Sequence, residues 1–254
     1  MCLLVLAFKA HPDYPLVLIG NRDEFHQRPA LPAHWWNTRR LLAGRDQTAG
    51  GTWLGVTDSG RLATVTNYRD PESKRDNAPS RGQLVVEALG RDNESMAEML
   101  VRTGSDYNGF NLLWGSRDGM RYAHNQGKAV IRSLEPGTYG LSNGLLNTPW
   151  PKLVRARTAL SEIIVRHGKL SSKLLFPILE DRQVPPDHAL PDTGIDRNWE
   201  RLLSTAFIRS SQYGTRASTV VIVDRDGLTT FHERTFDADG LMCTDRAYRF
   251  QIAG

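Results

Sequence analysis

The most constraining feature of this sequence is that its predicted strands follow one another as hairpins instead of alternating singly with helices. Short apolar runs lie on either side of turn-forming segments such as Asp58-Ser59-Gly60 and Asp226-Gly227. Parallel strands need a long crossover, so consecutive hairpins favour antiparallel sheets. The clearest hairpins are predicted at residues 3–8 with 16–20, 53–56 with 62–67, and 218–224 with 228–234.

Helices are predicted in two groups between these hairpins. Ser80 is placed to cap a helix over residues 81–89, and a capping box at Ser95 opens a short helix. A second pair of helices is predicted, one beginning near Pro151 and the other at Ser171. Residues 26–52, rich in proline and glycine, are expected to form an irregular excursion anchored by tryptophans. We therefore expect one α+β domain spanning residues 1–254, with antiparallel sheets carrying helices on their outer faces.

Composition excludes several classes of protein. The chain has 254 residues, of which 24% are charged, and its net charge of +4 is spread along the sequence without a basic block. With no nucleic-acid-binding motif, no nucleic-acid partner is expected. The apolar run Leu3–Phe8 is too short for a membrane span and lacks the flanks of a signal peptide. Two cysteines and no metal-ligand spacing favour a cytoplasmic protein that requires no metal or other cofactor.

Cys2 is the most informative single residue. Initiator methionine is removed when the next residue is small, which would leave Cys2 at the N-terminus. Its own α-amine, with an ordinary pKa of about 7.7–8.0, could then serve as the base for its thiol. If the first two strands pair, Arg22 is the cation best placed to favour the thiolate. The alternative is that Cys2 is a small buried hydrophobic residue.

Two asparagines end apolar strands, where asparagine is uncommon. Asn67 closes the run 62–67, and Asn143 follows Leu141-Ser142. A side-chain amide can donate a hydrogen bond to a developing oxyanion. An ordinary role in a turn is the alternative for each.

Seven segments taken together resemble the NRDE family, also called the transport and Golgi organisation 2 family. The similarity extends from residue 1 to about residue 224. The segments are Met1–Leu4, Gly20–Phe25, Ala43–Asp46, Gly50–Gly55, Thr66–Arg69, Leu141–Asn143 and Tyr213–Arg216.

This resemblance implies an N-terminal nucleophile hydrolase fold, a four-layer αββα sandwich. The chemistry it implies is that of cysteine amidases such as choloylglycine hydrolases, penicillin V acylase and acid ceramidase. Their nucleophile resembles Cys2, and their early arginine and acidic residue resemble Arg22 and Asp23. Arg22 and Asp23 are adjacent here, so their side chains should point to opposite faces of a strand.

The same resemblance assigns three later residues. The oxyanion asparagine of these amidases resembles Asn67, and their later asparagine resembles Asn143. Their late active-site arginine resembles Arg216, with Arg209 as the competing candidate.

The leading expectation is hydrolysis of a linear amide bond in a small-molecule amide or acyl substrate. A second is a non-enzymatic carrier of haem or a lipid-like ligand, an association that comes with the family. That carrier would use a pocket lined by Trp35, Trp36 and Trp53, and the possible axial ligands of haem would be Cys2, His11 and His34. A third is a scaffold that has lost its chemistry. The sequence leaves the oligomeric state open.

Overall fold

The structure is a computed structural model that describes residues 2–37 and 40–253. Within these residues the strands form a six-stranded and a seven-stranded sheet, and every neighbouring pair for which a register is defined is antiparallel. The six-stranded sheet has the order β10-β1-β2-β11-β12-β13. Its strands are β1 (Cys2–Phe8), β2 (Leu16–Phe25), β10 (Gly137–Leu141), β11 (Tyr213–Val223), β12 (Leu228–Phe236) and β13 (Met242–Gln251).

The seven-stranded sheet runs in sequence order from β3 to β9. Its strands are β3 (Ala30–Trp36), β4 (Leu41–Asp46), β5 (Leu54–Thr57), β6 (Leu62–Asn67), β7 (Phe110–Gly115), β8 (Met120–His124) and β9 (Val130–Ser133). The three predicted hairpins are confirmed by the pairings of β1 with β2, β5 with β6 and β11 with β12.

The prediction that residues 26–52 are irregular was wrong, because β3 and β4 lie within them. Pro32 is tolerated in β3 since β3 is an edge strand, and the pairing register shifts between Leu31 and His34 around that proline. An edge strand needs hydrogen bonds on one side only. Proline therefore does not mark a loop at this position.

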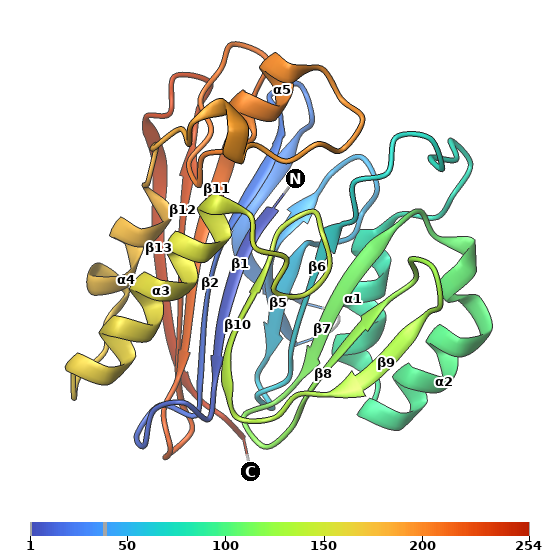
Figure 1. The fold of residues 1–254 in the computed structure, drawn as a ribbon. Helices are drawn as coiled ribbons and strands as arrows, with labels where there is room; N and C mark the ends of the chain where they lie inside the picture. Colours follow the sequence, from blue (N-terminus) through green and yellow to red (C-terminus); the bar gives the residue numbers. More distant parts are fainter. Residues whose placement is uncertain (1, 38–39, 254) are drawn as a thin grey trace.

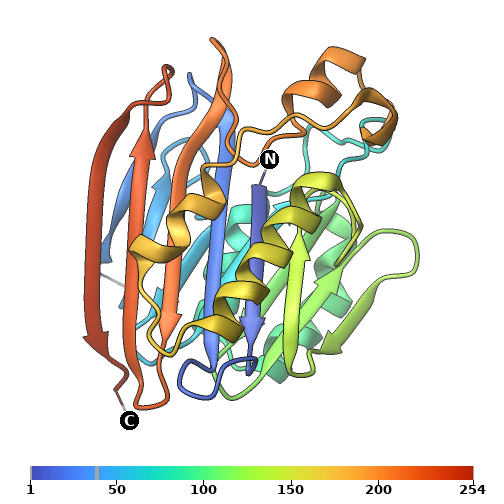
Figure 2. The same cartoon turned by 60° about the vertical axis from the view of Figure 1, so that its left-hand side comes forward.

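Helices cover both outer faces (Figures 1 and 2). Ser80 caps α1 as predicted by accepting a hydrogen bond from the Gly82 N–H. The cap of α2 is Asp92, not Ser95, because the Asp92 carboxylate accepts from the backbone N–H groups of Glu94 and Ser95. The helices are α1 (Arg81–Gly90), α2 (Asn93–Thr103), α3 (Pro151–Arg166), α4 (Ser172–Leu179) and α5 (Arg197–Leu202), with short 3-10 turns at Gly104–Asp106 and Asp187–Ala189.

The strand β1 shows how the layers are built. Its odd-numbered residues from Leu3 to Ala7 pack against α3 and α4, where they share a core with Leu160 of α3 and Phe176 of α4. Its even-numbered residues from Cys2 to Phe8 lie in the core between the two sheets. A third core joins the seven-stranded sheet to α1 and α2. The predicted α+β class and four-layer αββα sandwich are confirmed, and the alternation of β1 places Cys2 in the inter-sheet layer.

Among residues 2–37 and 40–253, no helix is both long and apolar enough to cross a membrane.

Candidate active site

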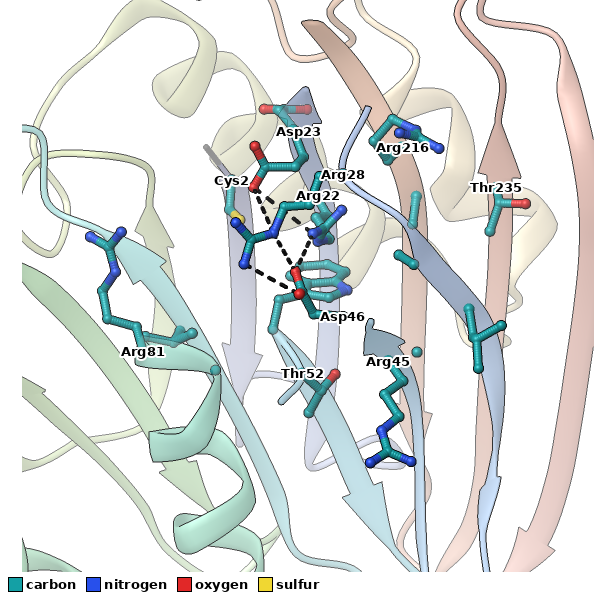
Figure 3. Close-up of a pocket in the computed structure, with 18 of the residues that line it drawn as sticks. Cys2, Arg22, Asp23, Arg28, Arg45, Asp46, Thr52, Arg81, Arg216 and Thr235 are labelled. Atoms are coloured by element: carbon teal, nitrogen blue, oxygen red, sulfur yellow. Dashed lines mark hydrogen bonds and ion pairs between the residues drawn. The ribbon is translucent and has the colours of Figure 1, made fainter. Parts of the chain in front are cut away.

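Cys2 lies at one end of the inter-sheet layer, in the wall of a cleft. The pairing of β1 with β2 places Cys2 directly opposite Arg22, and the cysteine is 8% exposed. The cleft has a volume of about 530 Å³ and is lined by both sheets and by the first residues of α1. Figure 3 shows the guanidinium of Arg22 beside Cys2. Met1, whose removal the N-terminal nucleophile hypothesis requires, lies outside the described residues.

The environment of Cys2 disfavours a thiolate. Burial raises the pKa of the thiol, and this outweighs the lowering effect of Arg22. Arg22 favours the thiolate as expected but does not by itself offset the effect of burial. A buried thiol in this position needs a base to accept its proton before it can act as a nucleophile.

Arg22 is held by a carboxylate from the other sheet. Its Nη2 donates to Asp46 Oδ2 at 3.0 Å, and the Nε of Arg28 donates to the same oxygen at 2.6 Å. Burial alone would raise the pKa of Asp46, but the hydrogen bonds from Arg28 and the Ala49 N–H bring it below its ordinary value. Asp46 thus remains ionised and fixes Arg22 beside Cys2. The sequence prediction did not assign Asp46 a role, although it ends the segment Ala43–Asp46 that supports the family resemblance.

Asn67 and Asn143 are joined across the two sheets. The Nδ2 of Asn143 donates to the backbone carbonyl of Asn67 at 2.9 Å. Asn67 lines the cleft, whereas Asn143 is buried behind it. The pairing of β1 with β10 ends at Leu4 and Leu141, so Asn143 lies two residues beyond the end of β10. The Oδ1 of Asn143 accepts no hydrogen bond from the described residues.

Asp23 is among the residues that line the cleft, but its carboxylate is held by a polar cluster separate from that of Arg22. Its Oδ1 accepts a hydrogen bond from Thr215 Oγ1 at 2.7 Å, and the charge of Lys152 in α3 acts on it. Burial raises the pKa of Asp23 and lowers that of Lys152 to about 8. Arg22, the residue before Asp23, instead reaches Asp46 of the other sheet. The side chains of Arg22 and Asp23 therefore point in different directions, as expected for neighbours on a strand.

The two candidates for the late arginine occupy different places. Arg216 lines the cleft and donates through Nη1 to the carbonyls of Phe25 and His26, at 3.3 and 3.0 Å. It sits where the pairing of β11 with β2 shifts register. Arg209 is exposed, forms a 3.8 Å ion pair with Asp239 and does not line the cleft. Of the two, only Arg216 is positioned to meet a substrate beside Cys2.

The glycine-rich turn before β5 orients one further arginine. A Cβ on Gly51 would lie 2.6 Å from the carbonyl carbon of Gly82, so the turn packs directly on the first turn of α1. That contact places Arg81, the first residue of α1, in the cleft wall. The sequence analysis did not single out Arg81, and only its position next to the Ser80 cap could have drawn attention to it.

The pocket suggested for a carrier is only partly formed. Trp53 lines the cleft, but Trp36 is buried against the layer of α1 and α2, and Trp35 packs edge-on against Phe250. The expectation that all three tryptophans line one pocket was therefore wrong.

Of the axial ligands considered for haem, Cys2 alone lies in the cleft. His11 is bonded to the carbonyl of His167, and His34 to that of Pro32. Haem would thus meet one candidate ligand here. Among the described residues, no group of three or more histidine, cysteine and acidic side chains could hold a metal ion.

Comparison with known proteins confirms the family resemblance drawn from the sequence. A profile of the family described as Transport and Golgi organisation 2 matches residues 1–238. The Transport and Golgi organization protein 2 homolog of Bos taurus is 38% identical over 259 residues, which cover 92% of this chain and 93% of that protein. The Homo sapiens homolog is 36% identical over 275 residues, or 99% of each chain.

Solved structures are similar in fold. A mutant of conjugated bile acid hydrolase from Clostridium perfringens superposes with a TM-score of 0.53 at 9% identity, covering 99% of this chain and 92% of that one. A second variant of that enzyme gives a TM-score of 0.50 at 10% identity, covering 100% and 98%. At such identities the likeness concerns the fold alone. The chain belongs to the Transport and Golgi organisation 2 family and has the fold of the N-terminal nucleophile hydrolases.

Proposed function

We propose that this protein hydrolyses a linear amide bond of a small molecule, with Cys2 as the nucleophile after removal of Met1. The observation that carries the proposal is the position of Cys2. It lies in the cleft opposite Arg22, and Asn67 lines the same cleft. A thiol whose pKa burial has raised requires an adjacent base. The α-amine of an N-terminal cysteine supplies one on the same residue.

The reaction takes place in two halves. In the first, the α-amine takes the thiol proton while Sγ bonds to the amide carbon, and the carbonyl oxygen becomes an oxyanion. When the oxyanion collapses, the C–N bond breaks. The α-ammonium gives its proton to the leaving nitrogen, which departs as a neutral amine. A thioester on Cys2 remains. In the second half, water adds to the thioester with its proton passing to the α-amine, the C–S bond breaks, and that proton returns to sulfur.

Each of the neighbouring residues has a proposed task. Asn67 lines the cleft and has a side-chain amide able to donate to the oxyanion. Arg22, fixed by Asp46, stabilises the negative charge on sulfur when the thioester breaks. The buried Oδ1 of Asn143, without a donor among the described residues, would accept from the α-amine of Cys2.

Two further residues act around this centre. Arg216 lies at the rim of the same cleft, where it would contact the substrate. Asp23 is buried beside Thr215 and Lys152, and we assign it to holding the start of β1 and its amine. The proposed mechanism requires no metal or other cofactor. The substrate would enter the cleft from solvent.

The carrier hypothesis has less support. Cys2 is the one haem-ligand candidate that lines the cleft, and it is also the nucleophile of the proposed hydrolase. The residues that line the cleft with it, an arginine held in place by a carboxylate and an asparagine, suit acyl transfer. No contact in the described part of the chain favours the carrier over the hydrolase.

The proposal is tested by comparing two cysteine variants. Cys243 also lines the cleft but is exposed, on β13, and thus provides a matched control. Amine release from a panel of N-acyl amides with short to long acyl chains should be abolished in Cys2→Ala and retained in Cys243→Ala. A thioester adduct should appear by mass spectrometry on the peptide that begins with Cys2. Turnover that survives in Cys2→Ala, or an adduct on Cys243, would contradict the proposal.

A further inference from the structure

The cleft wall is rich in arginine, and the arginines differ in whether a carboxylate neutralises them. Arg22 and Arg28 share Asp46 and lie within 3.9 Å of Glu24. The other arginines of the cleft form no ion pair with a carboxylate among the described residues. These are Arg45, Arg81 and Arg216.

The surroundings of these three arginines differ. Arg81 lines the cleft at the start of α1, and its guanidinium donates to one backbone carbonyl. Arg45 is exposed and stacks on the ring of Trp36 at 4.9 Å. Arg216 uses its Nη1 on two backbone carbonyls. Arg81 thus carries a partly buried positive charge in the cleft, without a carboxylate ion pair among the described residues.

The position of Arg81 is rigid. It begins α1, a ten-residue helix whose first turn is capped by Ser80 and packed against Gly51. One hydrogen bond anchors its side chain, from Nη1 to the carbonyl of Gly109 at 3.0 Å. A guanidinium has five N–H donors, so the remaining ones are available to a ligand in the cleft.

Of the acidic residues that line the cleft, Glu24 acts on Arg81 through its charge, but it also lies 3.9 Å from both Arg22 and Arg28. Asp237 accepts hydrogen bonds within its own turn, from the N–H groups of Asp239 and Leu241. Glu233 is 2% exposed and accepts from the Ala33 N–H. Burial raises the pKa of Glu233 to about 7, so part of its population is neutral near that pH. A partly buried cation in the same cleft as Cys2, with no ion pair among the described residues, therefore favours an anionic ligand.

We propose that Arg81 binds an anionic oxygen group of the substrate, a carboxylate or a phosphate, close to the amide bond that Cys2 attacks. The inference rests on the proposed function and names its substrate class, N-acyl compounds that carry an anion beside the amide. The planar guanidinium can bind either anion through two parallel hydrogen bonds. Arg81 is thus a specificity-determining residue.

Binding to a protein that cannot turn over tests this inference separately from the chemistry. In Cys2→Ala, isothermal titration calorimetry would compare N-octanoylglycine, its neutral analogue N-octanoylglycinamide and N-octanoyl-O-phosphoethanolamine. We expect at least one anionic ligand to bind tenfold or more tightly than the neutral one. A stronger carboxylate ligand would identify N-acyl amino acids as the class, and a stronger phosphate ligand would identify phosphorylated amines.

The variants then assign the preference to Arg81. Adding Arg81→Gln should bring the ratio of anionic to neutral affinity close to one, and Arg81→Lys should restore part of it. Arg91→Gln is a matched control, because Arg91 caps the other end of α1 and pairs with Glu87 at the surface. It should keep the full ratio. Equal binding of the three ligands, no binding of the anionic pair, or a preference that survives Arg81→Gln would overturn the inference, whether or not the protein proves to be a hydrolase.

Discussion

Glu233 provides a quantitative test of the electrostatics of the cleft. It is buried between the sheets, where its Oε1 accepts from the Ala33 N–H at 2.6 Å, and burial raises its pKa from 4.5 to about 7. Since the pKa is higher in the folded than in the unfolded state, the folded state favours the neutral carboxyl. Stability is therefore greatest below the unfolded value and is lost as the pH rises through the folded value.

The magnitude follows from the same shift. A rise from 4.5 to about 7 corresponds to about 3 kcal/mol once the pH exceeds both values, and to about 1 kcal/mol at pH 5. Glu233→Gln keeps the acceptor for Ala33 and removes the charge. We therefore expect the variant to be more stable than the wild type by an amount that grows by about 2 kcal/mol between pH 5 and pH 8.

Urea denaturation at the two pH values measures this difference, because the other titrating groups are common to both proteins. Glu98→Gln is the control, since Glu98 is exposed on α2 and should give the same small difference at both pH values. A stability difference for Glu233→Gln that is equal at pH 5 and pH 8 would refute the reasoning.

Two further substitutions test the packing around the cleft. Asn143→Ala removes the side-chain donor to the partly buried carbonyl of Asn67 and should lower the free energy of unfolding by about 1–3 kcal/mol in urea denaturation. An unchanged value would mean that this hydrogen bond contributes nothing to stability. Gly51→Ala forces a methyl group to within 2.6 Å of the Gly82 carbonyl carbon and should lower the free energy of unfolding by about 1–3 kcal/mol. Gly90→Ala is its control and should be neutral or slightly stabilising, because a Cβ at Gly90 meets nothing within 4 Å. Similar thermal midpoints for the two glycine variants would contradict the close contact.

The parts of the fold that could be predicted from sequence are those with strong local signals. The hairpin of β1 and β2 was predictable because two continuous apolar runs lie on either side of a short proline-containing turn. Its register then brings Cys2 opposite Arg22 without further information. By contrast, β9 and α5 were not predicted, because both are short and neither shows a clear apolar periodicity.

The remaining features depend on contacts between distant segments. Asp46 meets Arg22 only because the two sheets face each other, and no local pattern encodes that distance. The same holds for Arg81, which reaches the cleft because a glycine turn from another strand packs on α1. The edge position of β3, which makes Pro32 acceptable in a strand, is likewise a property of the assembled sheet.

The central claim is that Cys2 acts with its own α-amine, and the intact mass of the natively expressed protein tests it most directly. The account predicts a mass lower than that of the full sequence by one methionine residue, and a free amine on Cys2 in N-terminal sequencing. A protein that retains Met1 throughout would contradict the account, because the buried thiol would then lack the base that its raised pKa requires.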